Sequence, residues 1–301
     1  MKPQEIFDDQ FLARLQQLHL IAKRLTARSG AGRRPSRRLG DGLEFADHRD
    51  YAAGDDIRFV DWPYFARMDK LLLRLFHEHS EGAVSIMLDV SASMSPPSSD
   101  GEISLKLAYA MRAAAALAYV AMGSLERVSI FPFGDDLRPP MHAGRNRLQI
   151  LGVLDYLRGL IPGGETDLIR CCRRLATQGE ASGAVVVISD LLDCQEQIGD
   201  SLAHLRRLSG DLAVIQVYSP SDAAGIGGGP MLLEHAETIE RMSVNVSDNL
   251  LESYRRQWRL FVAGCEKASH GCGAIFVSAS TDIPFDQLIL RTLREAGVLE
   301  G

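Results

Sequence analysis

The sequence lacks long apolar runs, an even number of cysteines and an excess of positive charge. The longest uninterrupted apolar segment, Ala113 to Met122, has 10 residues, whereas a helix that crosses a membrane needs about 20. The first ten residues contain three acids and no apolar core, so we expect neither a secretory signal peptide nor a membrane anchor. These absences predict a cytoplasmic protein.

Cysteine and charge exclude two further classes. Five cysteines among 301 residues are an odd number and do not indicate a disulfide framework. With 33 basic and 39 acidic side chains the formal net charge is −6, which is not the composition of a general nucleic-acid binder. The 46% hydrophobic and 24% charged residues are typical of a globular chain, with room for one large domain and an appendage.

The pattern of the chain changes near residue 80. From Gly82 onward, apolar runs alternate with helical stretches, which is typical of an α/β domain with a mainly parallel sheet. We expect residues 81–301 to form this domain and residues 1–80 to form a smaller region packed on it. The expected strands are Ala83 to Asp89, Arg127 to Phe131, Ala184 to Ser189, Leu212 to Tyr218 and Ala274 to Ser278, and the clearest helices are Leu105 to Met122 and Asp248 to Ser269.

The amino-terminal region combines an amphipathic pattern with a basic arm. Apolar residues recur every three to five positions, which predicts a helix from about Pro3 to Thr26. Seven basic residues and no acid lie between Lys23 and Arg38. A solvated loop is the simpler interpretation of this arm; a membrane-surface, nucleic-acid or acidic-protein adaptor is the alternative, and the missing aromatic residues weaken the case for nucleic acid.

Oxygen-bearing side chains follow the first strand of the expected domain. Asp89, Ser91 and Ser93 lie on one tight loop at its carboxyl end, and ligands of doubly wound sheets bind at that edge. A turn or cap role for Asp89 alone is the simpler alternative. Three hard oxygens suit Mg²⁺, which takes six oxygen ligands and keeps several waters, so this loop by itself cannot complete a cation site.

Two other segments offer the missing oxygens at the same edge of the sheet. Thr166 lies in the loop Gly163 to Asp167, which precedes a helical stretch. Asp190 follows the strand Ala184 to Ser189, another buried strand that ends in a carboxylate. The three segments together predict one cation site.

This arrangement resembles the metal-ion-dependent adhesion site of von Willebrand factor A-like domains. Their Asp-x-Ser-x-Ser motif is matched by Asp89, Ser91 and Ser93, their threonine by Thr166 and their third-loop aspartate by Asp190. The resemblance implies a Rossmann-like, doubly wound, mainly parallel α/β sheet with a site for Mg²⁺ or Mn²⁺.

A second segment, Gly42 to His79, resembles the signature of the bacterial family known as domain of unknown function 58. The resemblance covers roughly Gly40 to Asp282. It implies a partnership with a MoxR-type AAA+ ATPase, because members are often encoded beside one. The chain departs from the family at Ser219 to Asp222, where an acidic Asp-Pro-x-Glu is expected.

The same signature segment forms a second candidate site, because it mixes acids, arginines and aromatic residues. A salt-bridged scaffold that clamps the amino-terminal region to the sheet is the favoured interpretation, since clustered charges are usually paired. A docking surface for the ATPase is the other, because aromatic and arginine side chains are enriched at binding hot spots. The residues of this signature cluster are Arg49, Asp55, Asp56, Arg58, Asp61, Trp62 and Arg67.

Two functions compete at the cation site. The first is a non-enzymatic, cation-dependent module that binds an acidic residue of a protein partner and acts with the ATPase in protein assembly or remodelling. The second is a metal-dependent phosphohydrolase with Asp89 as nucleophile, but that chemistry generally needs a second acid two residues on, where this chain has Ser91. The sequence also contains no Gly-x-Ser-x-Gly elbow, phosphate loop or His-Glu-x-x-His motif. We therefore expect no catalysis.

Overall fold

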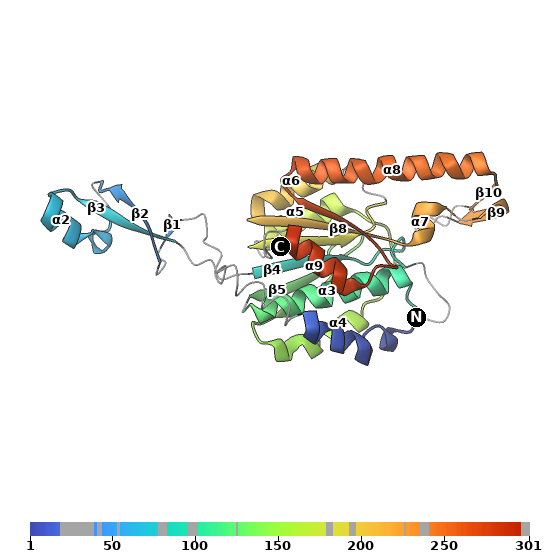
Figure 1. Cartoon of the computed structure of the whole chain (residues 1–301), viewed down its shortest axis with the longest axis horizontal. Coiled ribbons are helices and arrows are strands. Elements are labelled where there is room, and N and C mark those ends of the chain that lie inside the picture. Colours follow the sequence, from blue (N-terminus) through green and yellow to red (C-terminus); the bar gives the residue numbers. More distant parts are fainter. Residues whose placement is uncertain are drawn as a thin grey trace. The chain divides into compact units, whose positions relative to one another are not determined.

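The computed structural model describes residues 1–18, 39–40, 44–52, 55–77, 83–95, 102–124, 126–178, 183–192, 197–225, 227–234 and 241–295. These residues belong to two compact units. One combines Met1–Gly30 with Ala83–Gly301, and the other is Ala31–Gly82. Figure 1 shows the elements of each unit.

The larger unit is built on a six-stranded, mainly parallel sheet with the strand order β11-β8-β7-β4-β5-β6. Only β6, at one edge, pairs antiparallel, with β5. β4 lies between β7 and β5 and is buried on both faces, which explains its continuous apolar sequence. The α/β fold predicted from the alternating pattern is confirmed. The strands are β4 (Ala83–Asp89), β5 (Arg127–Phe133), β6 (Met141–Ala143), β7 (Ala184–Ser189), β8 (Asp211–Tyr218) and β11 (Ile275–Ser280).

Helices cover both faces of this sheet, and each face has its own core (Figure 1). One face packs against α3 (Leu105–Gly123), α4 (Ile150–Arg158) and α9 (Phe285–Glu295), with the short helix η3 (Arg147–Gln149) before α4. The other face packs against α5 (Leu168–Gln178), α6 (Ile198–Leu208) and α8 (Asp248–Gly271). Adjacent residues of β4 divide accordingly, since Ile86 and Leu88 join the first core and Met87 joins the second.

The helix α3 is the most buried of the larger unit. Among the described helices it alone is long and apolar enough to cross a membrane, but 83% of its most apolar stretch is buried inside the protein. Its small side chains, mainly alanine, let it lie close against the sheet. The apolar character of α3 is that of a core helix.

The amino-terminal segment belongs to the larger unit. It forms a short helix η1 (Pro3–Glu5) and a helix over residues 9–18. Its side chains Phe7, Phe11 and Leu15 lie in the core beside α3, and the Arg112 side chain donates a hydrogen bond to the Ile6 carbonyl at 2.6 Å. The sequence pattern predicts that this segment forms one region with the signature residues, but its apolar face is buried against the α/β unit.

A hairpin projects from the chain between α7 (Pro220–Ala224) and α8. Its strands are β9 (Gly229–Glu234) and β10 (Arg241–Val246), paired antiparallel. The sequence interpretation contained no strand here. The exposed side chains of Leu232, Leu233 and Met242 show why the apolar signal was too weak, because these strands bury little.

The smaller unit is a three-stranded antiparallel sheet with two short helices. The strand order is β1-β3-β2, with β1 (Leu39–Gly40), β2 (Glu44–Asp50) and β3 (Leu72–His77). Between β2 and β3 lie η2 (Ile57–Phe59) and α2 (Trp62–Met68). The α2 helix begins at Asp61, whose carboxylate accepts a hydrogen bond from the Tyr64 amide, and ends at Asp69 in the left-handed conformation (φ 52°).

Candidate cation site

Backbone hydrogen bonds bring two of the predicted loops together at the carboxyl edge of the sheet. The Val90 amide donates to the Phe133 carbonyl at 2.9 Å, which fixes the loop after β4 beside β5. The Gly163 amide donates to the Val90 carbonyl at 2.9 Å, and the Ala92 amide donates to the Gly164 carbonyl at 3.0 Å. The loop that carries Thr166 is therefore held against the loop that carries Ser91 and Ser93.

Asp89 is fully buried at the end of β4. Its carboxylate accepts a hydrogen bond from the Ser91 amide at 3.0 Å and another from the Ser189 hydroxyl at 2.5 Å. Burial raises the pKa of Asp89, and the charge of Asp190 raises it further, to about 7, although the hydrogen bonds act in the opposite direction. The protein thus holds a carboxylate whose negative charge is poorly compensated by its surroundings.

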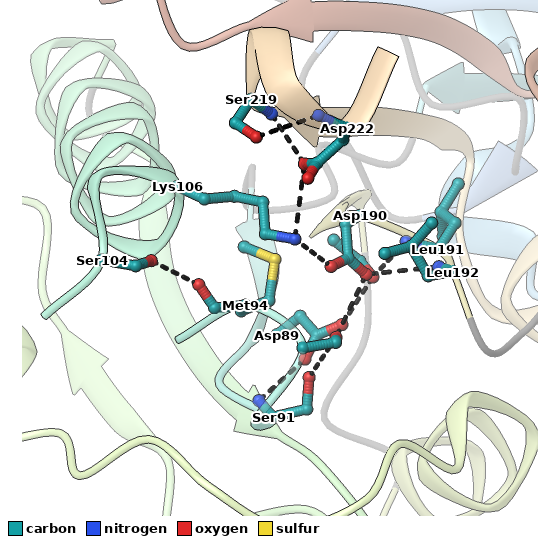
Figure 2. Close-up of polar contacts among 12 residues, drawn as sticks. Asp89, Ser91, Met94, Ser104, Lys106, Asp190, Leu191, Leu192, Ser219 and Asp222 are labelled. Atoms are coloured by element: carbon teal, nitrogen blue, oxygen red, sulfur yellow. Dashed lines mark hydrogen bonds and ion pairs between the residues drawn. The ribbon is translucent and has the colours of Figure 1, made fainter. Parts of the chain in front are cut away.

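The two serines connect Asp89 to Asp190, as Figure 2 illustrates for part of this network. The Ser91 and Ser93 hydroxyls lie 3.0 Å apart, and the Ser93 hydroxyl donates to Oδ1 of Asp190 at 3.3 Å. The same Asp190 oxygen accepts a hydrogen bond from the Leu192 amide at 3.2 Å. Four of the five residues predicted to ligate a cation therefore form one connected cluster.

Thr166, the fifth predicted ligand, is half-buried in the loop between α4 and α5. Its neighbours on both sides are fixed, since Gly164 accepts the Ala92 hydrogen bond and the Asp167 amide donates to the Gly134 carbonyl at 2.9 Å. The left-handed backbone at Gly163 and Gly164, with φ of 142° and 87°, is one that glycine adopts without strain. The turn that carries Thr166 uses these two glycines.

Lys106 is a residue of this cluster that the sequence interpretation missed. It lies in the first turn of α3, is 9% exposed, and places its ammonium Nζ 2.7 Å from Oδ2 of Asp190. Burial alone would lower the pKa of Lys106, but the charge of Asp190 and the hydrogen bond to it outweigh burial, so the pKa is raised. The available signal was a lysine in the first turn of a mainly apolar helix whose other charged residue is Arg112.

Asp222 is the second missed residue, and it lies in the segment where the chain departs from the family pattern. Its carboxylate oxygen Oδ2 is 3.6 Å from Nζ of Lys106. A reciprocal pair of hydrogen bonds holds it there, because the Ser219 amide donates to Asp222 at 2.8 Å and the Asp222 amide donates to the Ser219 hydroxyl at 3.3 Å. Figure 2 shows Lys106 reaching between Asp190 and Asp222.

These donors fit a small, hard cation. Asp89 and Asp190 supply buried carboxylate oxygens, and Ser91 and Ser93 supply neutral hydroxyl oxygens, which is the chemistry that Mg²⁺ prefers when waters complete its shell. The described residues contain no group of three His, Cys, Asp or Glu side chains arranged for a metal ion. The two carboxylates and two hydroxyls of the cluster are the donor types that a hard divalent ion prefers.

The signature cluster in the smaller unit consists of local pairs. Arg49 donates to Asp55 at 2.6 Å, and the guanidinium of Arg58 contacts Asp56 at 2.6 Å. The hydrogen bond from Arg58 lowers the pKa of Asp56, and that from Arg49 lowers the pKa of Asp55. These partners are close in sequence, and both pairs lie within the smaller unit.

The remaining members of the signature cluster, Asp61, Trp62 and Arg67, lie in or directly before α2. Asp61 caps the helix, and its Oδ2 atom also lies 3.0 Å from Nε2 of His48. The hydrogen bond with His48 lowers the pKa of Asp61. Arg67 donates to the Pro63 carbonyl at 3.2 Å on an exposed surface. Trp62 is exposed, with its ring edge-on to Phe65. The basic arm Lys23 to Arg38 lies outside the described residues.

Comparison with solved structures gives distant likenesses. They include the conserved hypothetical protein BatB from Bacteroides thetaiotaomicron, at 13% identity and a TM-score of 0.41, and an aerotolerance-related membrane protein from Bacteroides fragilis, at 14% and 0.42. Each comparison covers 72% of this chain and 98% of the other.

Sequence relatives are found in mycobacteria. Uncharacterized proteins from Mycobacterium bovis and Mycobacterium tuberculosis are each 26% identical to this chain over 267 residues, which is 87% of this chain and 83% of the relative. The family described as "Protein of unknown function DUF58" matches residues 47–260. That match spans most of the larger unit, including both strands that end in the site carboxylates, as well as much of the smaller unit. The chain therefore belongs to this family.

Proposed function

We propose that this protein is a non-enzymatic binding module that holds Mg²⁺ or Mn²⁺ and uses it to bind an acidic side chain of a protein partner. The cation would be held by Asp89, Ser91, Ser93, Thr166 and Asp190. The observation that carries the proposal is the connected chain from buried Asp89 through the two serine hydroxyls to Asp190. When bound, the cation supplies positive charge to an open coordination position.

The charge of the site favours an acidic partner. The serine and threonine ligands are neutral, so two carboxylates leave little negative charge to repel an incoming acid. Exposed apolar side chains adjoin the site residues in sequence, since Leu105 precedes Lys106 and Leu192 follows Asp190 by two positions. A partner carboxylate flanked by apolar residues suits this surface.

The partner we propose is a MoxR-type AAA+ ATPase or a client that it remodels, in a chaperone-like role in the cytoplasm. This part of the proposal comes from the family resemblance.

A phosphohydrolase is the alternative, and two observations weigh against it. Asp89 is fully buried and already accepts two hydrogen bonds, so its carboxylate is poorly placed to attack phosphorus. Position 91 is a serine and provides no general acid. The ammonium of Lys106, which could donate a proton, is already paired with Asp190.

The proposal is tested first by titrating the metal-free protein with Mn²⁺ or Mg²⁺ in a calorimeter. We expect binding to the native chain and its loss in Asp89→Ala, because that substitution removes a carboxylate that would ligate the cation. Asp155→Ala, on the exposed face of α4, is the matched control and should bind as the native chain does. Unchanged binding in Asp89→Ala would mean that the cation is held elsewhere.

A further inference from the structure

Lys106 brings a positive charge into the candidate cation site. It lies in the first turn of α3, and its side chain reaches to the ends of two other elements, 2.7 Å from Asp190 after β7 and 3.6 Å from Asp222 on α7. Its side chain is only 10% exposed, so water screens this charge weakly. The ammonium is held in place by two carboxylates that come from separate segments.

The ammonium and the proposed cation would share one carboxylate. Lys106 contacts Oδ2 of Asp190, while Oδ1 of the same residue accepts the hydrogen bond from Ser93. A divalent ion among Asp89, Ser93 and Asp190 would therefore sit one carboxylate away from a fixed positive charge. Both charges are in a poorly hydrated setting, where repulsion extends over such a separation.

We infer that Lys106 is a resident cation that keeps the affinity of the site for a free divalent ion low, so that firm occupancy requires the partner's carboxylate. This inference rests on the proposed function and adds how the site is regulated. A partner acid supplies the negative charge that Lys106 has offset. Metal and partner then increase each other's affinity by the same factor, as linkage requires.

A purely structural role for Lys106 leads to the opposite expectation. If the lysine only orients Asp190, its removal would let that carboxylate rotate, and the affinity for the metal would fall. If it acts as a resident cation, removing its charge would raise the affinity. The sign of the change therefore separates the two roles.

The deciding experiment is calorimetric titration of the full-length, metal-free protein with Mn²⁺, comparing the native chain with Lys106→Met. We expect Lys106→Met to bind Mn²⁺ about tenfold more tightly or better. Lys106→Arg keeps the charge and should bind within about threefold of the native chain. Lys267→Met, at an exposed position of α8, controls for the loss of a distant lysine and should change nothing.

Asp222→Asn provides a second, independent readout should Lys106→Met not fold. An asparagine still accepts the hydrogen bond from Ser219 and leaves the contact between Lys106 and Asp190 in place. It removes a charge that offsets the ammonium, so we expect the affinity for Mn²⁺ to fall about threefold or more.

The outcomes distinguish failure of this inference from failure of the proposed function. If the native chain binds Mn²⁺ and folded Lys106→Met binds it equally or more weakly, the role of Lys106 is overturned and the cation site stands. If Lys106→Met does not fold, unchanged Mn²⁺ affinity in Asp222→Asn leads to the same conclusion. Binding in Lys106→Met alone supports the inference. If neither chain binds Mn²⁺, there is no cation site and both proposals fall.

Discussion

At the scale of single residues, the site is a set of buried charges that only partly balance. Asp89 and Asp190 are buried carboxylates at adjacent strand ends, and the ammonium of Lys106 is paired with Asp190 and Asp222. Asp89 receives hydrogen bonds but no direct ion pair among the described residues. An uncompensated buried charge costs folding free energy, which a bound cation would recover.

The raised pKa of Asp89 predicts how the stability of the metal-free protein depends on pH. Its pKa lies near 7 when folded and near 3.8 when unfolded, so the folded state holds this proton more tightly between those values. The free energy of unfolding should fall as pH rises from about 4 to about 7, by at most about 1.4 kcal/mol per pH unit from this group. Asp89→Asn should remove that contribution.

Urea unfolding of the native chain and Asp89→Asn in a chelator, at several pH values, measures this effect. The variant should be the more stable of the two near neutral pH, and the difference should vanish near pH 4. A difference that stays constant across this range would show that the carboxyl of Asp89 titrates normally in the folded protein.

At the scale of elements, the position of β7 beside β4 depends on a glycine. Gly183 precedes β7 with φ of 94°, and a Cβ atom there would lie 2.2 Å from the Ala83 carbonyl oxygen of β4. An alanine would have to displace one of the two strands that carry the site carboxylates. We expect Gly183→Ala to reduce the free energy of unfolding by roughly 2–4 kcal/mol and to weaken Mn²⁺ binding.

Gly199→Ala is the matched control for this prediction. Gly199 lies in α6, where an added Cβ meets nothing within 4 Å. Alanine favours the helix there by up to about 1 kcal/mol, so this variant should be as stable as the native protein or slightly more stable. Chemical denaturation of both variants decides the matter, and equal stabilities would show that the strands tolerate the added methyl group.

At the scale of the whole molecule, the two compact units offer separate surfaces to a partner. The larger unit carries the candidate cation site, and the smaller unit carries the signature cluster with exposed Trp62. The charges of Arg49 and Arg58 are already paired with neighbouring acids. We therefore expect association with the proposed ATPase partner to depend on the cation more than on these arginines.

A pulldown of the ATPase with and without EDTA, repeated with Arg58→Glu, tests this division. Arg58 is 80% exposed, so its reversal should leave stability within about 0.5 kcal/mol of the native chain. We expect EDTA to weaken the association about tenfold or more and Arg58→Glu to change it less than about threefold. Arg294→Glu, on the surface of α9, controls for net charge.

The opposite result would move the partner to the smaller unit. Association that survives chelation but is lost in Arg58→Glu would make the signature cluster the docking surface. Arg58 is a better probe of that surface than Asp61, because Asp61 caps α2 and contacts His48, so its substitution would also disturb the helix.

Sequence patterns that involve only residues close together along the chain determined much of the fold. β4 and β7 were predicted with the bounds that the structure has, because strands buried on both faces are continuous apolar runs. The carboxylates that close these strands follow from the same pattern, so the cluster from Asp89 to Asp190 could be anticipated. Parallel strands place their carboxyl ends at one edge whatever the rest of the chain does.

Only the tertiary structure decided which distant charges meet. Lys106 and Asp190 are 84 positions apart, and nothing in the local pattern of either indicates the other. The position of Asp222 depends on a cap formed with Ser219, in the segment that departs from the family pattern. The amino-terminal helix joined the α/β unit, and not the signature residues that follow it, because its apolar face is buried beside α3. Burial and ion pairing act between surfaces that meet only in the folded chain, so sequence periodicity does not specify them.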